Sequence, residues 1–401
     1  MTAIKNCHGT GWVLVLALSF APCAGALTEQ EAVQQGLAEP DLQSRKAAQL
    51  TEAEAAVQAA GHWDNPVIEY NREDLDLQRG TSEETTIWLR QRINIAGVHG
   101  LNRQAAEHSL TANQYHHELE EREWATRLRL AFYQTLAAQQ RMAAVSALET
   151  RLATLTDTVQ RRAERGDASR FDVLRMRNEL AVLSSDHESA SADHNAQQAA
   201  LFALINAPAE PLEGGLLPPG DALPPVDLSQ HPELLALGAE QRSAESRAQA
   251  ERRARWPELT LSVGRKELSE PGIELDGNTF AVGVEIPLFD RGQGHDQVAQ
   301  SRAYQLQADQ AILQRQLRAD VDGLKTALRS HHQSASELAR LNVDEQSSLS
   351  YLAEISYQAG ELTVMELLDA YQSDLATAQR LIEVSLQARL SYIQLQQLHG
   401  E

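Results

Sequence analysis

Two very long stretches without helix-breaking residues constrain the fold of this chain more than any other feature. From Leu101 to Arg165 there is neither proline nor glycine, so about 65 residues can form one helix roughly 100 Å long. The second stretch, His295 to Ala359, has a single interruption, Gly323. Helices of this length exceed any ordinary globular domain, and we expect them to pack as coiled coils.

The spacing of apolar residues supports coiled-coil packing. In the first stretch they recur at alternating intervals of three and four, as in a heptad seam. The same register in the second stretch is broken by two polar residues, Glu345 and Ser348, so that helix is less well buried or faces water. The first seam is Val145, Leu148, Leu152, Leu155 and Val159, and the second is Leu338, Leu341, Glu345, Ser348, Leu352 and Ile355.

The chain carries one structural plan twice. Each half reads as a helix, two strands joined by a polar loop, a long helix, a glycine-centred break and a shorter helix. Gly166 and Gly360 at the breaks lie 194 residues apart, and Pro66 and Pro257 before the strands lie 191 apart. This near-constant offset indicates an internal duplication.

The duplication sets the predicted domain boundaries. The first repeat covers residues 27–207, and the second covers residues 231–401. Residues 208–230 form a linker, because their prolines and glycines support neither a helix nor a central strand. The shorter helices are expected at Gln30–Ala60 and His231–Arg255 before the strands, and at Asp167–Ile205 and Glu361–Leu398 after the breaks.

Four segments alternate apolar and polar residues with the period of a β-strand. One apolar face and one polar face over about 10 residues are typical of a membrane β-barrel strand, although a small soluble sheet packed on helices is the alternative. The apolar positions are Ile68 and Tyr70; Ile87, Leu89, Ile93 and Ile95; Leu259, Leu261 and Val263; and Phe280, Val282, Val284, Ile286 and Leu288.

The number of strands distinguishes these two interpretations. A membrane barrel must close, and the smallest barrels use about eight strands, whereas this chain offers four. Two copies would give a barrel filled by its own side chains, while three copies would leave a lumen. Arg90, Arg92 and Glu285 on the polar face require water, which favours the wider barrel.

The first 26 residues read as an export signal. Lys5 begins it, residues 11–20 are apolar but too short to span a bilayer, and residues 24–26 fit a small-x-small cleavage site. Cys23 also permits a lipoprotein signal, but we favour simple cleavage. Both cysteines, Cys7 and Cys23, then leave with the signal, which excludes disulfides and cysteine nucleophiles in the mature chain.

Charge and motifs exclude other classes of protein. A formal charge of -21 argues against nucleic-acid binding, since phosphate contacts need lysine and arginine. No nucleophile, phosphate-loop or metalloprotease motif occurs, so we predict neither catalytic residues nor a cofactor. The histidines, including the adjacent pairs His116-His117 and His331-His332, have no metal-ligand spacing, and we predict no tight metal site.

The export signal, the duplicated plan and the segment 357-YQAGELTVMELLDA-370 resemble the TolC family of outer-membrane efflux proteins. The resemblance covers essentially the whole mature chain, and the junction 286-IPLFDRGQG-294 is most similar to the heavy-metal branch that serves resistance-nodulation-division pumps. It implies a mainly α fold with a small β part, in which a homotrimer forms a twelve-stranded barrel in the Gram-negative outer membrane. A helical tunnel would continue it across the periplasm to a periplasmic adaptor and an inner-membrane pump.

The same resemblance assigns roles to residues around the glycine-centred breaks, which would lie about 100 Å from the barrel. It places a periplasmic gate at Glu366 and Asp369, which share one helix face. Threefold symmetry would gather six carboxylates around the tunnel axis, where they would attract cations. The adaptor-docking surface would include Arg165, Gly166, Ser169, Gly360, Glu361 and Thr363.

The family also holds its tunnel mouth shut with links between neighbouring coils. Tyr357 and Asp172 match two positions of that lock, and a hydrogen bond between them would contribute about 1–3 kcal/mol. Leu362 stands where the best-known lock has an arginine, so the closing network differs here.

The function expected is a passive exit duct for small molecules or metal cations. The sequence leaves two alternatives open. One is the exit duct of a type I protein-secretion system, which uses the same architecture. The other is a periplasmic coiled-coil adaptor, although an adaptor carries one hairpin rather than two.

Overall fold

The computed structural model describes residues 26–77, 80–220, 226–289, 291–341 and 348–399 of the 401-residue chain. The expected export signal, including Cys7 and Cys23, therefore lies outside the described residues except for Ala26. Among the helices described, none is both long enough and apolar enough to cross a membrane.

The elements occur twice in the same order, and the fold is mainly α with one small sheet, as predicted. The first set is α1 (Glu29–Leu37), α2 (Pro40–Ala60), β1 (Val67–Leu77), β2 (Gly80–Ile93), α3 (Val98–Glu164) and α4 (Arg170–Ile205). A short 3-10 helix, η1 (Leu228–Gln230), precedes the second set. That set is α5 (Pro232–Arg253), β3 (Glu258–Glu270), β4 (Ile273–Glu285), α6 (Gln293–Leu341), α7 (Leu349–Gln358) and α8 (Val364–His399).

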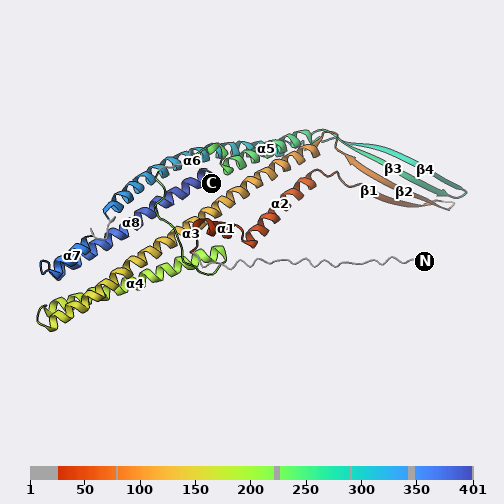
Figure 1. The fold of residues 1–401 in the computed structure, drawn as a ribbon. Coiled ribbons are helices and arrows are strands. Elements are labelled where there is room, and N and C mark those ends of the chain that lie inside the picture. The colour runs from red at the N-terminus through yellow and green to blue at the C-terminus, as the bar shows by residue number, and fades with distance from the viewer. Residues whose placement is uncertain (1–25, 78–79, 221–225, 290, 342–347, 400–401) are drawn as a thin grey trace, which may run out of the picture.

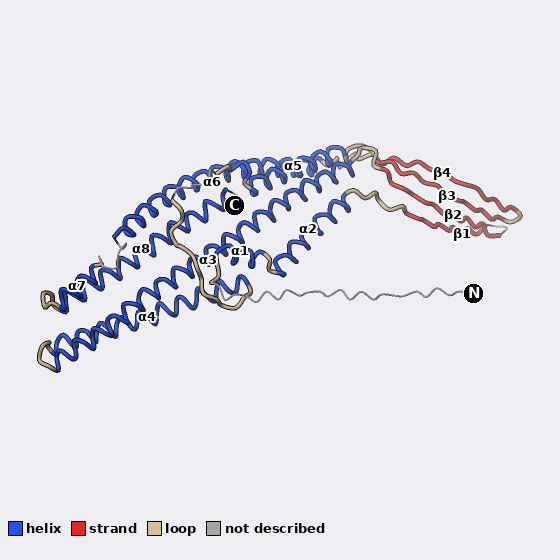
Figure 2. The backbone as a smooth tube through the Cα atoms, viewed as in Figure 1, coloured by secondary structure: helices blue, strands red, loops and turns tan. Residues whose placement is uncertain are grey.

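The molecule is elongated, with the sheet at one end and the turns of two helical hairpins at the other (Figure 1). One hairpin consists of α3 and α4, and the other of α7 and α8 (Figure 2). The helix α3 contacts α4, α5 and α8, while α6 contacts α5 and α8. With 67 residues, α3 is about 100 Å long and connects the two ends of the molecule.

The second long helix differs from the sequence expectation. Gly323 lies inside α6 and does not interrupt it, which fits the cost of only about 1 kcal/mol for an interior glycine. The break comes later, since Ser348 has an extended backbone and its side chain accepts a hydrogen bond from the Tyr351 amide at 3.2 Å. Asp374 of α8 accepts from the Ser350 amide at 2.9 Å. Ser348 is therefore the N-cap of a separate helix, not a member of a continuous seam.

Two other boundaries also differ. The N-terminal helix expected over Gln30–Ala60 is divided before Pro40, where the Glu39 carboxylate caps α2 through the Leu42 amide at 2.9 Å. The strand expected to run to Leu288 begins earlier, at Ile273, and ends at Glu285, so Ile286 and Leu288 lie beyond it. Pro287 has no amide hydrogen to donate, which ends the pairing there.

The four strands form one antiparallel sheet in the order β1-β2-β3-β4. Its register brings the apolar positions of all four strands into rows: Ile68 faces Leu89, Leu89 faces Val263, and Val263 faces Phe280. These side chains are exposed, Phe280 to 78%. The opposite face carries the ion pairs Arg90–Glu69 at 2.7 Å and Lys266–Glu84. The predicted separation of the two faces is therefore confirmed.

The apolar face is a band of limited height. From Ile93 to Ile87 it spans about 20 Å along β2, close to the roughly 25 Å apolar band of outer-membrane barrels. Beyond it, toward the β-hairpins, the same face carries charged residues, among them Arg265 and Asp276, which form an ion pair at 2.6 Å.

The helical core near the hairpin turns confirms the first predicted seam. Val145, Leu152 and Val159 are buried there, and Leu148 and Leu155 pack against the same cluster. In the second seam Leu352 and Ile355 are half exposed, which fits the expectation that this helix is less well buried. The new cap at Ser348 resets the helix, and α7 instead buries Ala353 and Tyr357. Glu345 lies outside the described residues.

Candidate functional site at the hairpin turns

Both hairpin turns are built by the same backbone geometry. Gly166 and Gly360 have φ of 86° and 79°, a conformation that favours glycine, and a Cβ would meet nothing within 4 Å at either. The Asp167 amide donates to the Arg162 carbonyl at 2.8 Å, and the Glu361 amide donates to the Ser356 carbonyl at 2.9 Å. The two hydrogen bonds are related by the same offset of 194 residues as the glycines. The open space around both glycines shows that the turns project from the bundle.

Each turn is followed by a capping box that starts the returning helix. Ser169 caps α4, and its hydroxyl and amide contact the Asp172 carboxylate at 2.7 and 3.1 Å. Thr363 contacts the Glu366 carboxylate in the same way, at 2.8 Å from both hydroxyl and amide. The returning helices therefore begin at Arg170 and Val364, three residues later than the sequence suggested.

Two of the predicted gate residues, Asp172 and Glu366, therefore accept hydrogen bonds within these caps. The hydrogen bonds from the Thr363 amide and hydroxyl hold the pKa of the Glu366 carboxyl below its ordinary value. Because its folded pKa is lowered, the ionised cap stabilises the fold at neutral pH and is lost as the pH falls through that pKa. Glu366 and Asp369 are both exposed on α8, and neither has an ion pair in the described part of the chain. Their gate role stays a prediction.

Tyr357 contacts a different residue from the one expected. Its side chain is 7% exposed, and the guanidinium of Arg162 lies 5.4 Å from the centre of its ring. Asp172 is engaged by Ser169 instead, and no hydrogen bond joins Tyr357 to Asp172 in the described chain. Within one protomer, the contact between the two hairpins at this level is a cation–π contact. The predicted hydrogen bond stays a prediction for another state of the mouth.

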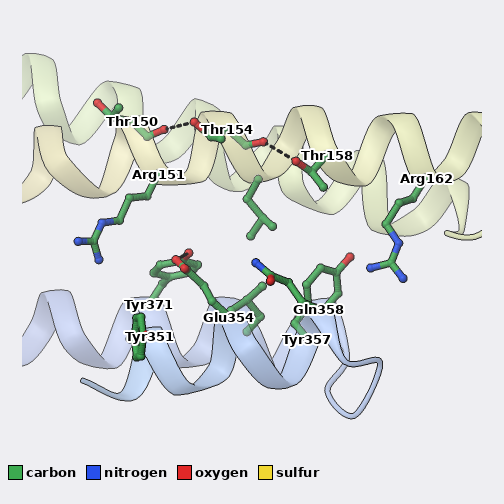
Figure 3. Close-up of a pocket in the computed structure, with 12 residues that line it drawn as sticks. Thr150, Arg151, Thr154, Thr158, Arg162, Tyr351, Glu354, Tyr357, Gln358 and Tyr371 are labelled. Carbon is green, nitrogen blue, oxygen red and sulfur yellow. Dashed lines mark hydrogen bonds between the residues drawn. The ribbon is translucent and has the colours of Figure 1, made fainter. Parts of the chain in front are cut away.

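A hollow of about 440 Å³ lies beside this contact, between α3 and the pair α7 and α8. Figure 3 shows Thr150, Thr154 and Thr158 along α3, and Arg151 and Arg162 of the same helix pointing toward the second hairpin with its tyrosines and Glu354. Tyr371 donates to Glu354, and burial together with that hydrogen bond raises the pKa of the Tyr371 phenol. The two hairpins thus meet through a partly polar layer at this hollow, beside a shared apolar cluster in which Leu152 and Val159 of α3 lie with Leu367 of α8.

Sequence reasoning missed the residues that line this layer. Arg162, Glu354 and Tyr371 belong to no motif and were not singled out. A usable signal was present for one of them, since Arg162 lies one helical turn before Gly166 and Tyr357 lies in the same turn before Gly360. Applying the repeat offset would have placed both side chains at one height.

The remaining predicted residues at the turns lie at the free end of the bundle. Arg165, Gly166, Ser169, Gly360, Glu361 and Thr363 are all exposed. Leu362 packs against the core near the turns. Among the residues that the structure describes, no three histidine, cysteine or acidic side chains come together as a metal site.

Comparisons with known proteins agree with this architecture. Residues 223–401 match the family model described as "Outer membrane efflux protein". The chain is 28% identical over 256 residues to the cobalt-zinc-cadmium resistance protein CzcC of Cupriavidus metallidurans. That alignment covers 61% of this chain and 59% of the relative, so it spans about three fifths of the relative's length.

Solved structures share the fold at low sequence identity. CusC is similar with a TM-score of 0.77 and 18% identity, over 93% of this chain and 92% of that one. The CmeC outer membrane channel of Campylobacter jejuni has a TM-score of 0.75 and 13% identity, over 99% and 94% of the two chains. The MtrE outer membrane channel of Neisseria gonorrhoeae, in its open state, has a TM-score of 0.74 and 17% identity, over 93% of this chain and 88% of that one.

Fold and sequence therefore lead to the same group of proteins. The duplicated plan, the exposed apolar face of the sheet and the paired hairpin turns occur together in one chain. The chain has the fold of outer-membrane channel proteins, and its residues 223–401 match the model of the outer membrane efflux protein family.

Proposed function

We propose that three copies of this chain form an outer-membrane exit duct for a tripartite efflux pump. The observation that carries the proposal is the sheet: four described strands with two unpaired edges, β1 and β4, and one exposed apolar face. Lipid cannot satisfy a strand edge, so such a sheet is stable in a membrane only when other copies close it. Three copies supply twelve strands, enough to surround a lumen lined by the charged face.

The helices would continue that lumen away from the membrane. At about 100 Å, α3 is more than three times the thickness of the hydrocarbon core, so most of the molecule lies outside it. The free hairpin turns at the far end would dock the periplasmic adaptor through the surface around Gly166 and Gly360. The adaptor would in turn join the duct to an inner-membrane resistance-nodulation-division pump, which supplies the energy.

Fractionation of the cell envelope tests this assembly. We expect the chain in the outer-membrane fraction, extracted by detergent as a species of three times the monomer mass, and conducting ions in planar bilayers. A monomer in the soluble periplasmic fraction would contradict the proposal and favour an adaptor or scaffold.

The cargo we propose is divalent metal cations. The support is the match to a relative named for cobalt, zinc and cadmium resistance. Deletion of the gene should then lower the tolerated concentration of these metals, while complementation should restore it. Unchanged metal tolerance with reduced drug tolerance would point to drug efflux, and unchanged tolerance with loss of a secreted protein would point to a secretion duct.

The gate proposed at Glu366 and Asp369 can be tested without disturbing the helix start. Glu366→Gln removes the charge but retains a side chain that serves a capping box, and Asp369→Asn removes the second charge. We expect the double variant to lose most of its cation preference in single-channel recordings, because six carboxylates leave the mouth.

The matched control for the gate is Thr363→Ala. It breaks the same capping box, whose contacts are 2.8 Å, but leaves both carboxylates in place. We expect its cation preference to equal that of the wild type. Equal preference in the double variant as well would show that these carboxylates do not line the conducting path.

A further inference from the structure

A second hollow, of about 780 Å³, lies where the sheet joins the helices. One wall is the segment after β4, in which Ile286 and Leu288 are each 62% exposed and Phe289 is 95% exposed. Arg255 and Arg291 also line the hollow. An apolar wall beside two cations fits a ligand that has both an apolar chain and an anionic group.

The arginines of this hollow differ in how they are held. Arg255 donates to Asp296 at 2.8 Å, and Asp296 is 7% exposed, so the guanidinium is fixed at the rim. Arg252 lies 3.7 Å from the same carboxylate. Arg291 is exposed, and its side chain makes no ion pair in the described chain. Among the described residues that line the hollow, two are arginines and none is acidic.

The hollow also lies at a particular height on the molecule. Ile286 and Leu288 continue the alternation of Val282 and Val284, so the apolar face of the sheet extends into the hollow and ends there. Trp256, next to Arg255, is 63% exposed, and its counterpart Trp63 in the first repeat is 61% exposed. Exposed tryptophans concentrate at the level of lipid headgroups.

We propose that this hollow binds an anionic phospholipid of the surrounding bilayer. The phosphate lies between Arg291 and Arg255, and an acyl chain lies along Leu288 and Phe289. The proposal rests on membrane insertion of the sheet, as proposed above. It adds a bound lipid at the junction of sheet and helices, where the headgroup charge complements the arginines.

Lipid binding is measured on the full chain purified in detergent, with phosphatidylglycerol and with neutral phosphatidylcholine, by native mass spectrometry. We expect phosphatidylglycerol to bind in preference, and Arg291→Gln to weaken its binding about fivefold, as expected for one arginine near a lipid surface. The matched control is Arg175→Gln, an exposed arginine of α4 near the opposite end of the molecule, which should bind as the wild type does.

The apolar wall is tested separately. Phe289→Ser should also weaken phosphatidylglycerol binding, whereas Phe171→Ser, which changes a 68% exposed phenylalanine near a hairpin turn, should not. Inorganic phosphate at millimolar concentration should compete poorly, because it has no acyl chain. Competition by phosphate alone would make the site a phosphate site and overturn the lipid assignment.

The lipid proposal and the proposed function fail in different ways. If the wild-type trimer is found in the outer membrane but Arg291→Gln binds phosphatidylglycerol as the wild type does, the lipid site is wrong and the duct stands. Crosslinking of Phe289 to a neighbouring copy in place of lipid would have the same meaning. If the wild-type chain is absent from the outer membrane, both proposals fail.

Discussion

Arg389 is a buried cation that ties the linker between the repeats to the helical bundle. It is 9% exposed, and its guanidinium donates to the carbonyl oxygens of Gly215, Leu216 and Leu217 at 2.7, 2.9 and 2.9 Å. The guanidinium carbon also lies 4.5 Å from the centre of the Tyr133 ring. Arg389 therefore adds three hydrogen bonds to a linker whose Leu212 and Leu216 are also buried in the helical core.

Replacing Arg389 with methionine should destabilise the protein by about 3 kcal/mol, because buried carbonyls lose their donors. Thermal or chemical unfolding in detergent measures the loss. The matched control in the same helix is Arg380→Met, which removes an exposed ion pair to Glu383 at 2.7 Å and should cost less than about 1 kcal/mol. Equal losses in the two variants would show that the linker is held by other contacts.

At the scale of elements, the two hairpins share a buried apolar cluster and also meet through a polar contact near their turns. Arg162 of α3 covers the Tyr357 ring of α7, and the hollow beside them is partly polar. A contact of this kind is worth about 0.5–2 kcal/mol, little enough for a docking partner to reverse. Separation of the hairpins would also break part of the apolar cluster that they share, so this contact adjusts the equilibrium rather than setting it alone.

This contact predicts a difference between two variants. Arg162→Gln removes the cation and should shift an open–closed equilibrium of the mouth about fivefold toward open, for a loss of about 1 kcal/mol. Tyr357→Phe keeps the ring and should leave the mouth as closed as in the wild type. Susceptibility to large antibiotics measures the leak, and Arg161→Gln, an exposed neighbour, is the control.

The opposite result would also be informative. If the Tyr357→Phe variant becomes more susceptible to large antibiotics and the Arg162→Gln variant does not, the phenol-to-carboxylate hydrogen bond expected from the sequence is favoured. The closed mouth would then depend on an arrangement of Tyr357 and Asp172 other than the one in this structure.

At the scale of the whole molecule, the apolar face of the sheet decides whether the chain enters a membrane. Phe280→Lys places a charge on that face, at a cost of about 2–4 kcal/mol per copy near the bilayer midplane. Ala281→Lys changes the next residue of the same strand, on the polar face, and is the matched control. We expect the first variant to reduce the trimer recovered from the outer membrane, and the second to leave it unchanged.

Comparable trimer yields for the two lysine variants would contradict the assignment of faces. A loss in both would indicate that the lumen is too narrow for a lysine at this level. In either case the twelve-stranded arrangement would need revision, because it depends on which face meets lipid.

The sequence by itself determined the order of elements, the duplication, the two faces of the strands and the positions of both turns. These features follow from local periodicity and from glycine and proline, whose effects on the backbone act within a few residues. It also located Gly166, Gly360 and the carboxylates that follow them.

Only the tertiary structure decided which side chains meet across elements. Arg162 against Tyr357, Arg389 against the linker, and the cap of Ser350 by Asp374 join residues from 24 to 195 positions apart, and no local pattern encodes such pairs. The break at Ser348 belongs to the same class, since α8, the other helix of the same hairpin, accepts a hydrogen bond from the first turn of α7. Packing between distant segments, rather than local preference, selects among the conformations that the sequence allows.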